Sequence, residues 1–163
     1  MKGHVNIPSP ISEVSTSWTR QYDVQIFLKR DDLIHPQISG NKWRKLKYNL
    51  SQAKKEGCNT ILTFGGAYSN HIAATAAAGF KEGILTYGII RGEEILPLNK
   101  TLLLAQNNGM KFIFVSREEY KKKTKSEKVK AIIKTLDTPY IIPEGGANAL
   151  GVLGCEEISN SER

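Results

Sequence analysis

Apolar residues recur along this chain in two patterns that alternate with each other. Short apolar runs such as residues 60–64 (TILTF) and 111–115 (KFIFV) have the length and the β-branched or aromatic content of strands. Between these runs, apolar residues recur every three or four positions, as on one face of a helix. Strands and helices that alternate through short connections favour a parallel sheet. The sequence therefore predicts an α/β fold with three layers, a parallel sheet between helices on both faces.

The bounds of each element follow from the same pattern and from the glycines that interrupt it. Gly57 and Gly79 are expected to end two of the helices. The predicted strands cover residues 24–29, 60–64, 84–90, 111–115 and 140–142, and the predicted helices cover 42–56, 69–78, 96–107 and 125–136.

Four further segments carry weaker signals. Residues 1–20 contain two prolines and indicate an extended arm, and Ser116 begins a polar connection. Residues 143–151 (PEGGANALG) predict a glycine-rich turn, and a further helix starts over 150–158. No strand follows that helix, which leads us to expect the front portion of a longer enzyme.

Composition places the chain among globular proteins. Its 163 residues are 40% hydrophobic and 24% charged, enough for one domain with a buried core. Cys58 and Cys155 show no metal-ligand spacing, the three histidines do not cluster with them, and we expect both cysteines to be small buried side chains. No secretory signal and no apolar stretch of membrane-spanning length is present, so we expect a cytoplasmic protein.

The net charge of +7 raises the possibility of an anionic partner. Seven lysines lie between residues 121 and 134. Such a run is more often a solvated helix face than a nucleic-acid site, and no base-reading motif accompanies it. We therefore expect no nucleic-acid partner, with a non-catalytic basic binding module as an alternative.

The most informative stretch is residues 39–48 (SGNKWRKLKY). Lys42 is expected on the first turn of a helix, where the positive end of the helix dipole disfavours an ammonium group. An amine that loses its proton near neutral pH can condense with an aldehyde. Lys42 is thus placed for covalent chemistry, although a solvated lysine on a basic helix would give the same pattern.

A second segment, residues 64–71 (FGGAYSNH), predicts a strand that runs through two glycines into a helix. The exposed backbone N–H groups and the positive helix end suit an anion such as a carboxylate, and Ser69 and Asn70 can add side-chain hydrogen bonds. An ordinary turn with a capping serine remains the alternative. Residues 91–94 (RGEE) follow a strand end, where ligands of α/β proteins bind, although a polar loop explains them as well.

Together these motifs resemble a known family. SGNKWRKLKY and GGAYSNH, with KRDD at residues 29–32 and PEGG at 143–146, are similar to the pyridoxal-phosphate-dependent family that holds 1-aminocyclopropane-1-carboxylate (ACC) deaminase and D-cysteine desulfhydrase. The similarity spans residues 29–157. It implies the two-domain fold type of the tryptophan synthase β chain and the cofactor pyridoxal 5'-phosphate.

The resemblance assigns cofactor roles to four residues. Lys42 would form the covalent link to the cofactor aldehyde and shuttle protons once released, and Lys45 would lie near the cofactor phosphate. Asn70 would bond the phenolic oxygen of the cofactor, and Asn41 would be a further cofactor contact. No metal ligand is implied.

The resemblance also assigns substrate roles. Ser69 would bind the substrate carboxylate and take part in catalysis, with Asn70 and His71 lining the same pocket. ACC deaminases proper carry Gln where this chain has His71, whereas desulfhydrase-like members carry His. The expected reaction converts a small amino acid, of the D-cysteine or ACC type, to a 2-oxo acid and ammonia. A cysteine-synthase-like β-replacement remains an alternative.

The same resemblance implies a domain plan. Residues 1–50 would begin a large cofactor domain, residues 51–140 would form a small α/β domain, and residues 141–163 would return to the large one. The family's main phosphate-binding loop and the acid that faces the cofactor ring nitrogen lie beyond residue 163. We therefore expect this portion alone to be inactive, and the full-length enzyme to be a homodimer.

Overall fold

The computed structural model describes residues 5–136 and 138–160. Its centre is a four-stranded sheet in the order β5-β4-β3-β6, in which every neighbouring pair is parallel. β3 (Thr60–Gly66) pairs with β4 (Leu85–Arg91) on one side and with β6 (Tyr140–Ile142) on the other, and β5 (Lys111–Val115) lies at the edge. β3 is buried along most of its length, as expected for a strand covered on both faces.

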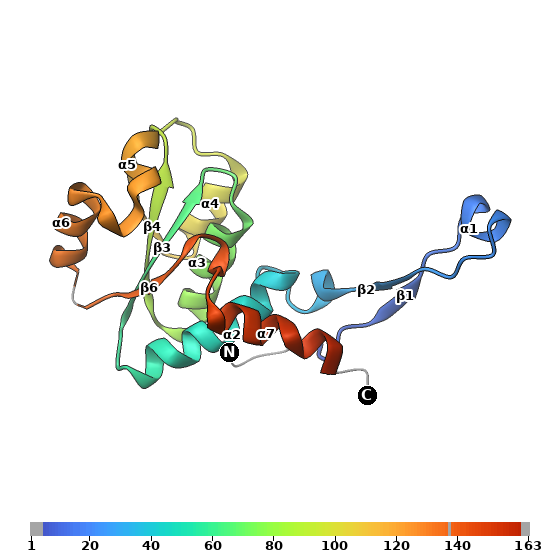
Figure 1. Cartoon of the computed structure of the whole chain (residues 1–163). Helices are drawn as coiled ribbons and strands as arrows, with labels where there is room; N and C mark the ends of the chain where they lie inside the picture. The colour runs from blue at the N-terminus through green and yellow to red at the C-terminus, as the bar shows by residue number, and fades with distance from the viewer. Residues whose placement is uncertain (1–4, 137, 161–163) are drawn as a thin grey trace.

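Helices cover both faces of this sheet (Figure 1). On one face, α3 (Asn70–Glu82) packs beside α4 (Lys100–Asn107) and α2 (Asn41–Lys55). On the other face lie α5 (Arg117–Lys122) and α6 (Glu127–Thr135), which bury Tyr120 and Val129 against β3 and β4. The predicted fold class, a parallel sheet between two helical layers, is confirmed.

The C-terminal helix α7 (Ala149–Asn160) packs along α2. The two helices approach so closely at Gly154 that a Cβ atom there would lie 2.0 Å from the carbonyl oxygen of Arg44. A short 3-10 turn, η3 (Glu144–Gly146), connects β6 to this helix. The helix that follows the last strand of the sheet, α7, therefore packs against α2, the helix that precedes the first strand of the sheet.

The N-terminal part forms a ribbon that extends away from the sheet and its helices (Figure 1). β1 (Ile11–Glu13) pairs antiparallel with β2 (Phe27–Lys29), and α1 (Ser17–Gln21) lies between them. A 3-10 turn, η1 (Asp31–Leu33), leads from the ribbon toward α2. The expectation of an extended arm over 1–20 misses α1, and the predicted strand over 24–29 is shortened to its second half.

Several other predicted bounds are corrected. α3 continues through Gly79 and ends at Gly83, which adopts the left-handed conformation that terminates helices. The connection after Ser116 contains α5 and the 3-10 turn η2 (Lys123–Lys125), because Ser116 caps a helix there. α4 begins only at Lys100, capped by Asn99, and the predicted turn over 143–151 already contains the start of α7.

The described residues form neither a membrane-spanning helix nor a cluster of metal ligands. Along the described residues, no helix has both the length and the apolar character needed to cross a membrane. Within the same ranges, no group of three or more His, Cys, Asp or Glu side chains gathers around a possible metal position. Cys58 and Cys155 are free thiols and half-buried rather than fully buried as predicted, and His4 lies outside the described residues.

Candidate active site

The start of α2 borders a hollow of about 330 Å³. Asn41, Lys42 and Asn70 line it, together with residues of the preceding loop and of α3. The ammonium nitrogen of Lys42 donates a hydrogen bond to Oδ1 of Asn41 at 2.8 Å. Two motifs that lie far apart in the sequence thus meet at one cavity, with a primary amine at its wall.

The environment of Lys42 lowers the pKa of its amine. Partial burial is the larger cause, because it penalises the charged form, and the positive charge of Lys45 is the next. The sequence argument expected the same direction from the helix N-terminus. Gly40, with φ of 62°, precedes this helix and offers no side chain to cap it. The amine is therefore easier to deprotonate than a solvated lysine.

A buried ion pair holds the start of α2 in place. Arg44 is 2% exposed, and its Nε and Nη2 donate to the two carboxylate oxygens of Asp31 at 2.6 and 2.9 Å. Ser9 Oγ donates to the same carboxylate at 2.6 Å, and the backbone oxygen of Asp31 accepts from the Gly40 N–H at 3.0 Å. Asp31 belongs to the KRDD segment, so that segment acts here as a clamp on the helix that carries Lys42.

The N-terminus of α3 is built by Gly65 and Ser69. Ser69 caps the helix by accepting from the Ile72 N–H. A Cβ at Gly65 would lie 2.4 Å from Ile72 Cγ1 and 2.9 Å from Ser69 Oγ, so only glycine permits this tight junction. The backbone N–H groups of Asn70 and His71 make no hydrogen bond to any residue that the structure describes. They are available to an anion at the positive end of the helix.

His71 is buried, with 2% of its surface exposed, and turns toward the sheet. Its Nε2 lies 2.8 Å from Thr63 Oγ1, and the Thr63 hydroxyl donates to the Ile142 carbonyl at 2.8 Å. Because that hydroxyl proton is already engaged, Nε2 must carry the proton of the ring. Nδ1 is then an acceptor, and it is buried without a partner among the described residues.

The pKa of His71 is lowered to about 4. Burial is the main cause, followed by the positive charges of Lys42 and Lys45, while Glu144 acts weakly in the opposite direction. The ring is therefore neutral at physiological pH. It offers a fixed hydrogen-bond acceptor beside two lysines rather than a positive charge.

The η3 turn contacts the side chain of Lys45 and lies close to that of His71. Lys45 Nζ donates to the Gly145 carbonyl at 3.3 Å. A Cβ at Gly146 would lie 3.2 Å from Lys45 Cβ and 3.7 Å from His71 Cε1, so the turn packs closely on both side chains. The PEGG segment, which the sequence analysis named as a glycine-rich turn and as part of the family resemblance, thereby packs against two of the predicted site residues.

The structure thus brings most of the predicted site residues together, but not in one cavity. Lys42, Asn41 and Asn70 line the hollow. The other predicted site residues are not among the described residues that line it: Lys45, Ser69 and His71. Ser69 caps the N-terminus of α3, and the His71 side chain packs against Thr63 of the sheet. Thr63 and the Asp31–Arg44 pair were not predicted, since nothing in their local sequence shows which distant residues they contact.

Comparison with known proteins gives consistent relatives, although no family model matches the chain. It is 38% identical over 145 residues to a protein of Pyrococcus abyssi with the provisional name 1-aminocyclopropane-1-carboxylate deaminase, covering 83% of this chain and 41% of that protein. It is 33% identical over 139 residues to the bifunctional D-cysteine desulfhydrase/1-aminocyclopropane-1-carboxylate deaminase, mitochondrial, of Arabidopsis thaliana, covering 80% of this chain and 35% of that protein.

A solved structure extends the comparison to the fold. The crystal structure of an ACC deaminase homologue matches with a TM-score of 0.82 and 28% identity, over 98% of this chain and 49% of that one. The chain spans less than half the length of the curated relatives described here. The resemblance inferred from the sequence motifs is confirmed by these matches.

Proposed function

Because this chain is homologous to proteins of the ACC deaminase and D-cysteine desulfhydrase family, we propose that it forms the lysine-bearing part of a pyridoxal-phosphate-dependent deaminase or lyase. One observation carries the proposal: a partly buried amine of lowered pKa, Lys42, shares a hollow with Asn70 at the N-terminus of α3. A deprotonated lysine is what covalent attachment of an aldehyde cofactor requires.

The residues around the hollow fit such a cofactor. Lys42 would hold it covalently, with Asn41 as a neighbouring contact that already bonds the amine. Asn70 would bond the phenolic oxygen, and Lys45 would lie near the phosphate. When bound, pyridoxal phosphate supplies an electron sink for negative charge that develops beside the substrate nitrogen. Lys42, whose pKa is lowered, would also serve as the base that moves a proton at the substrate carbon.

The proposed substrate is a small amino acid of the D-cysteine or ACC type. Its carboxylate would be held by the free N–H groups of Asn70 and His71, with Ser69 beside them as a further contact and candidate catalytic group. The neutral His71 ring would line the pocket from below and contribute an acceptor at Nδ1. The products would be a 2-oxo acid and ammonia, by a lyase-type elimination or ring opening.

The domain plan and the assembly are part of the same proposal. Residues 1–50 and 141–163 would belong to a large cofactor domain, which the packing of α7 on α2 supports. Residues 51–140 would form the small domain around β3, β4 and β5. The whole enzyme would be a cytoplasmic homodimer.

Trapping the cofactor on the chain tests the proposal. The 163-residue protein is incubated with pyridoxal phosphate, reduced with borohydride and digested, and the modified peptide is located by mass spectrometry. We expect the label on Lys42, and its loss in Lys42→Ala. Lys55→Ala is the matched control, because Lys55 is an exposed lysine at the other end of α2 and should leave the label unchanged. A label spread over surface lysines, or placed on a different single lysine, would refute the assignment.

A further inference from the structure

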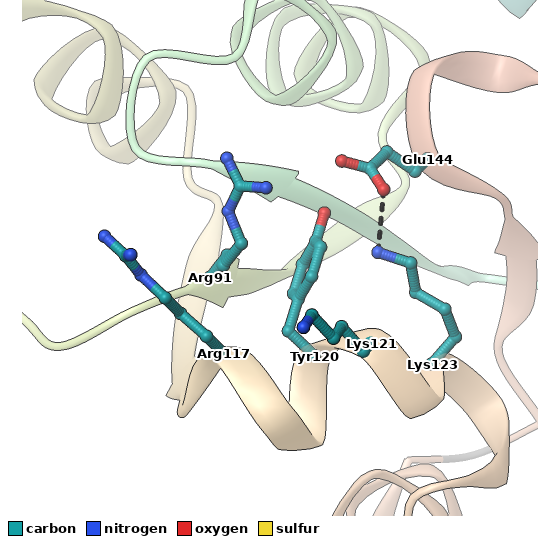
Figure 2. A pocket seen from close by; sticks show the side chains of 6 residues that line it. All are labelled: Arg91, Arg117, Tyr120, Lys121, Lys123 and Glu144. Carbon is teal, nitrogen blue, oxygen red and sulfur yellow. Dashed lines mark hydrogen bonds and ion pairs between the residues drawn. The ribbon is translucent and has the colours of Figure 1, made fainter.

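A second hollow, of about 640 Å³, borders the η3 turn through Glu144, next to the Gly145 carbonyl that Lys45 contacts. It opens beside the carboxyl end of β4, where α5 begins (Figure 2). Ligands of parallel α/β sheets bind at this edge. The residues that line it are Arg91, Arg117, Tyr120, Lys121, Lys123 and Glu144.

Positive charge dominates this basic hollow, with four cationic side chains facing one carboxylate. Lys123 Nζ pairs with the Glu144 carboxylate at 2.7 Å. Arg117 and Lys121 make no ion pair with any described residue, so no described carboxylate pairs with their charges. The Arg91 guanidinium lies 5.7 Å from the centre of the Tyr120 ring, and a contact with a ring face uses none of its N–H donors.

Tyr120 supplies a hydroxyl donor to the hollow, and the Glu144 carboxylate lies near enough to interact with it. The Tyr120 side chain is 3% exposed. In Figure 2 this hydroxyl points between Arg91 and Glu144. Burial, and then the neighbouring Glu144 carboxylate, raise the pKa of Tyr120 well above its usual range, so the group stays protonated. No described residue completes a hydrogen bond of ordinary geometry with this hydroxyl, and a ligand oxygen could do so.

We propose that the basic hollow binds a small oxyanion with two or more negative charges, such as a phosphate monoester or a di- or tricarboxylate. Arg91 and Arg117 would contact it through their planar forks, which match carboxylate and phosphate oxygens. Lys121 would add a third positive charge, and the Tyr120 hydroxyl a neutral donor once Lys123 and Glu144 separate to admit the ligand. The site is separate from the Lys42 hollow and does not depend on the proposed function.

Titration calorimetry on the 163-residue chain, without cofactor, tests this site. Inorganic phosphate and citrate are the probes, with acetate as a singly charged comparison. We expect at least one multivalent probe to bind saturably and more tightly than acetate, and the tighter of the two identifies the ligand chemistry. Arg91→Gln and Arg117→Gln should each weaken binding about tenfold, the loss expected for a charge-assisted hydrogen bond.

Three further variants distinguish specific anion binding in the basic hollow from non-specific attraction of anions to the positively charged surface. Lys134→Gln removes one charge from an exposed position on α6 and should leave the affinity unchanged. Lys42→Ala should also leave it unchanged, because Lys42 lies in the other hollow. Glu144→Gln should tighten binding severalfold, since it removes the carboxylate that opposes the anion.

The opposite results would overturn the proposal. Equal weakening by Lys134→Gln and Arg91→Gln would show diffuse attraction, and loss of binding in Lys42→Ala would place the anion in the candidate active site. Duplex DNA that binds while both small anions do not would show a nucleic-acid surface instead. Tyr120→Phe keeps the buried ring and removes only the hydroxyl, so weakened binding in this folded variant would support the site even if an arginine variant unfolds.

Discussion

At the scale of single residues, His71 is the clearest case of a side chain whose chemistry is set by its surroundings. Its Nε2 proton is fixed by Thr63, and its Nδ1 is left unpaired beside two lysines. Its pKa of about 4 lies below the ordinary value for histidine. Between these two values the unfolded chain binds a proton that the folded chain does not. The neutral ring therefore stabilises the fold above about pH 6.5, and this contribution is lost as the pH falls toward and below 4.

We predict that His71→Gln removes this pH dependence. In the natural chain, the contribution to the free energy of unfolding lost between about pH 7 and pH 4 should be on the order of 3 kcal/mol. Glutamine keeps a donor for Thr63 and does not titrate, so the loss should shrink in the variant. Chemical unfolding at a series of pH values measures it, with His35→Gln as a control that leaves His71 in place. A His71 ring that titrates by NMR near pH 6.5 would contradict the assignment.

The residues that sequence reasoning could identify are those whose role depends on their neighbours along the chain. Lys42 and Asn70 stand at helix starts marked by glycine, serine and asparagine, and both line the same hollow. The roles of Thr63 and Tyr120 could not be predicted in this way. Thr63 contacts His71 and a carbonyl 79 positions away, and the residues that line the basic hollow with Tyr120 come from β4, α5, η2 and η3. Their roles follow from the fold rather than from any local pattern.

At the scale of elements, the Asp31–Arg44 pair ties the η1 turn to α2. Two hydrogen bonds join the side chains, at 2.6 and 2.9 Å, and Arg44 is almost fully buried. We predict that Arg44→Met lowers the free energy of unfolding by about 3 kcal/mol, because it leaves the Asp31 carboxylate without its charged partner. Arg30→Met is the matched control, since the Arg30–Asp32 pair is exposed and its loss should change the free energy of unfolding far less.

Urea unfolding monitored by circular dichroism measures both variants, and a double-mutant cycle isolates the pair. If Arg44 acts through Asp31, the Asp31→Asn/Arg44→Met double variant should be less destabilised than the sum of the single variants. Strictly additive losses would show that Arg44 stabilises the chain through packing alone.

The elements themselves were predictable where local pattern and tertiary packing agree. β5 and β6 have the predicted bounds, because each is a short apolar run between polar residues. The predicted end of α3 at Gly79 was wrong for a reason that the sequence does not show. A Cβ at that position would lie 2.2 Å from Thr86 Cγ2, so the glycine serves close packing of the helix on β4 rather than termination. Gly83, at φ of 68°, ends the helix instead.

At the scale of the whole molecule, the sheet and its helices bury most of their apolar side chains, whereas the N-terminal ribbon leaves apolar side chains exposed. Phe27 and Leu28 are successive residues of β2, so their side chains point to opposite faces, yet they are 60% and 51% exposed. Neither face of the ribbon is therefore covered by the described residues. A two-stranded ribbon with open edges and apolar faces is weakly stable on its own and readily pairs with other surfaces.

We predict that the ribbon makes the 163-residue chain self-associate, with a sedimentation coefficient that rises with protein concentration. Phe27→Ser and Leu28→Ser should each reduce this rise, because each removes an apolar side chain from one face of the ribbon. Phe80→Ser is the control: Phe80 is 68% exposed but lies on α3, away from the ribbon. If Phe80→Ser reduces association as much as the ribbon variants do, exposed apolar residues in general, rather than the ribbon, drive the association. A concentration-independent monomer would show that the exposed ribbon faces do not drive association.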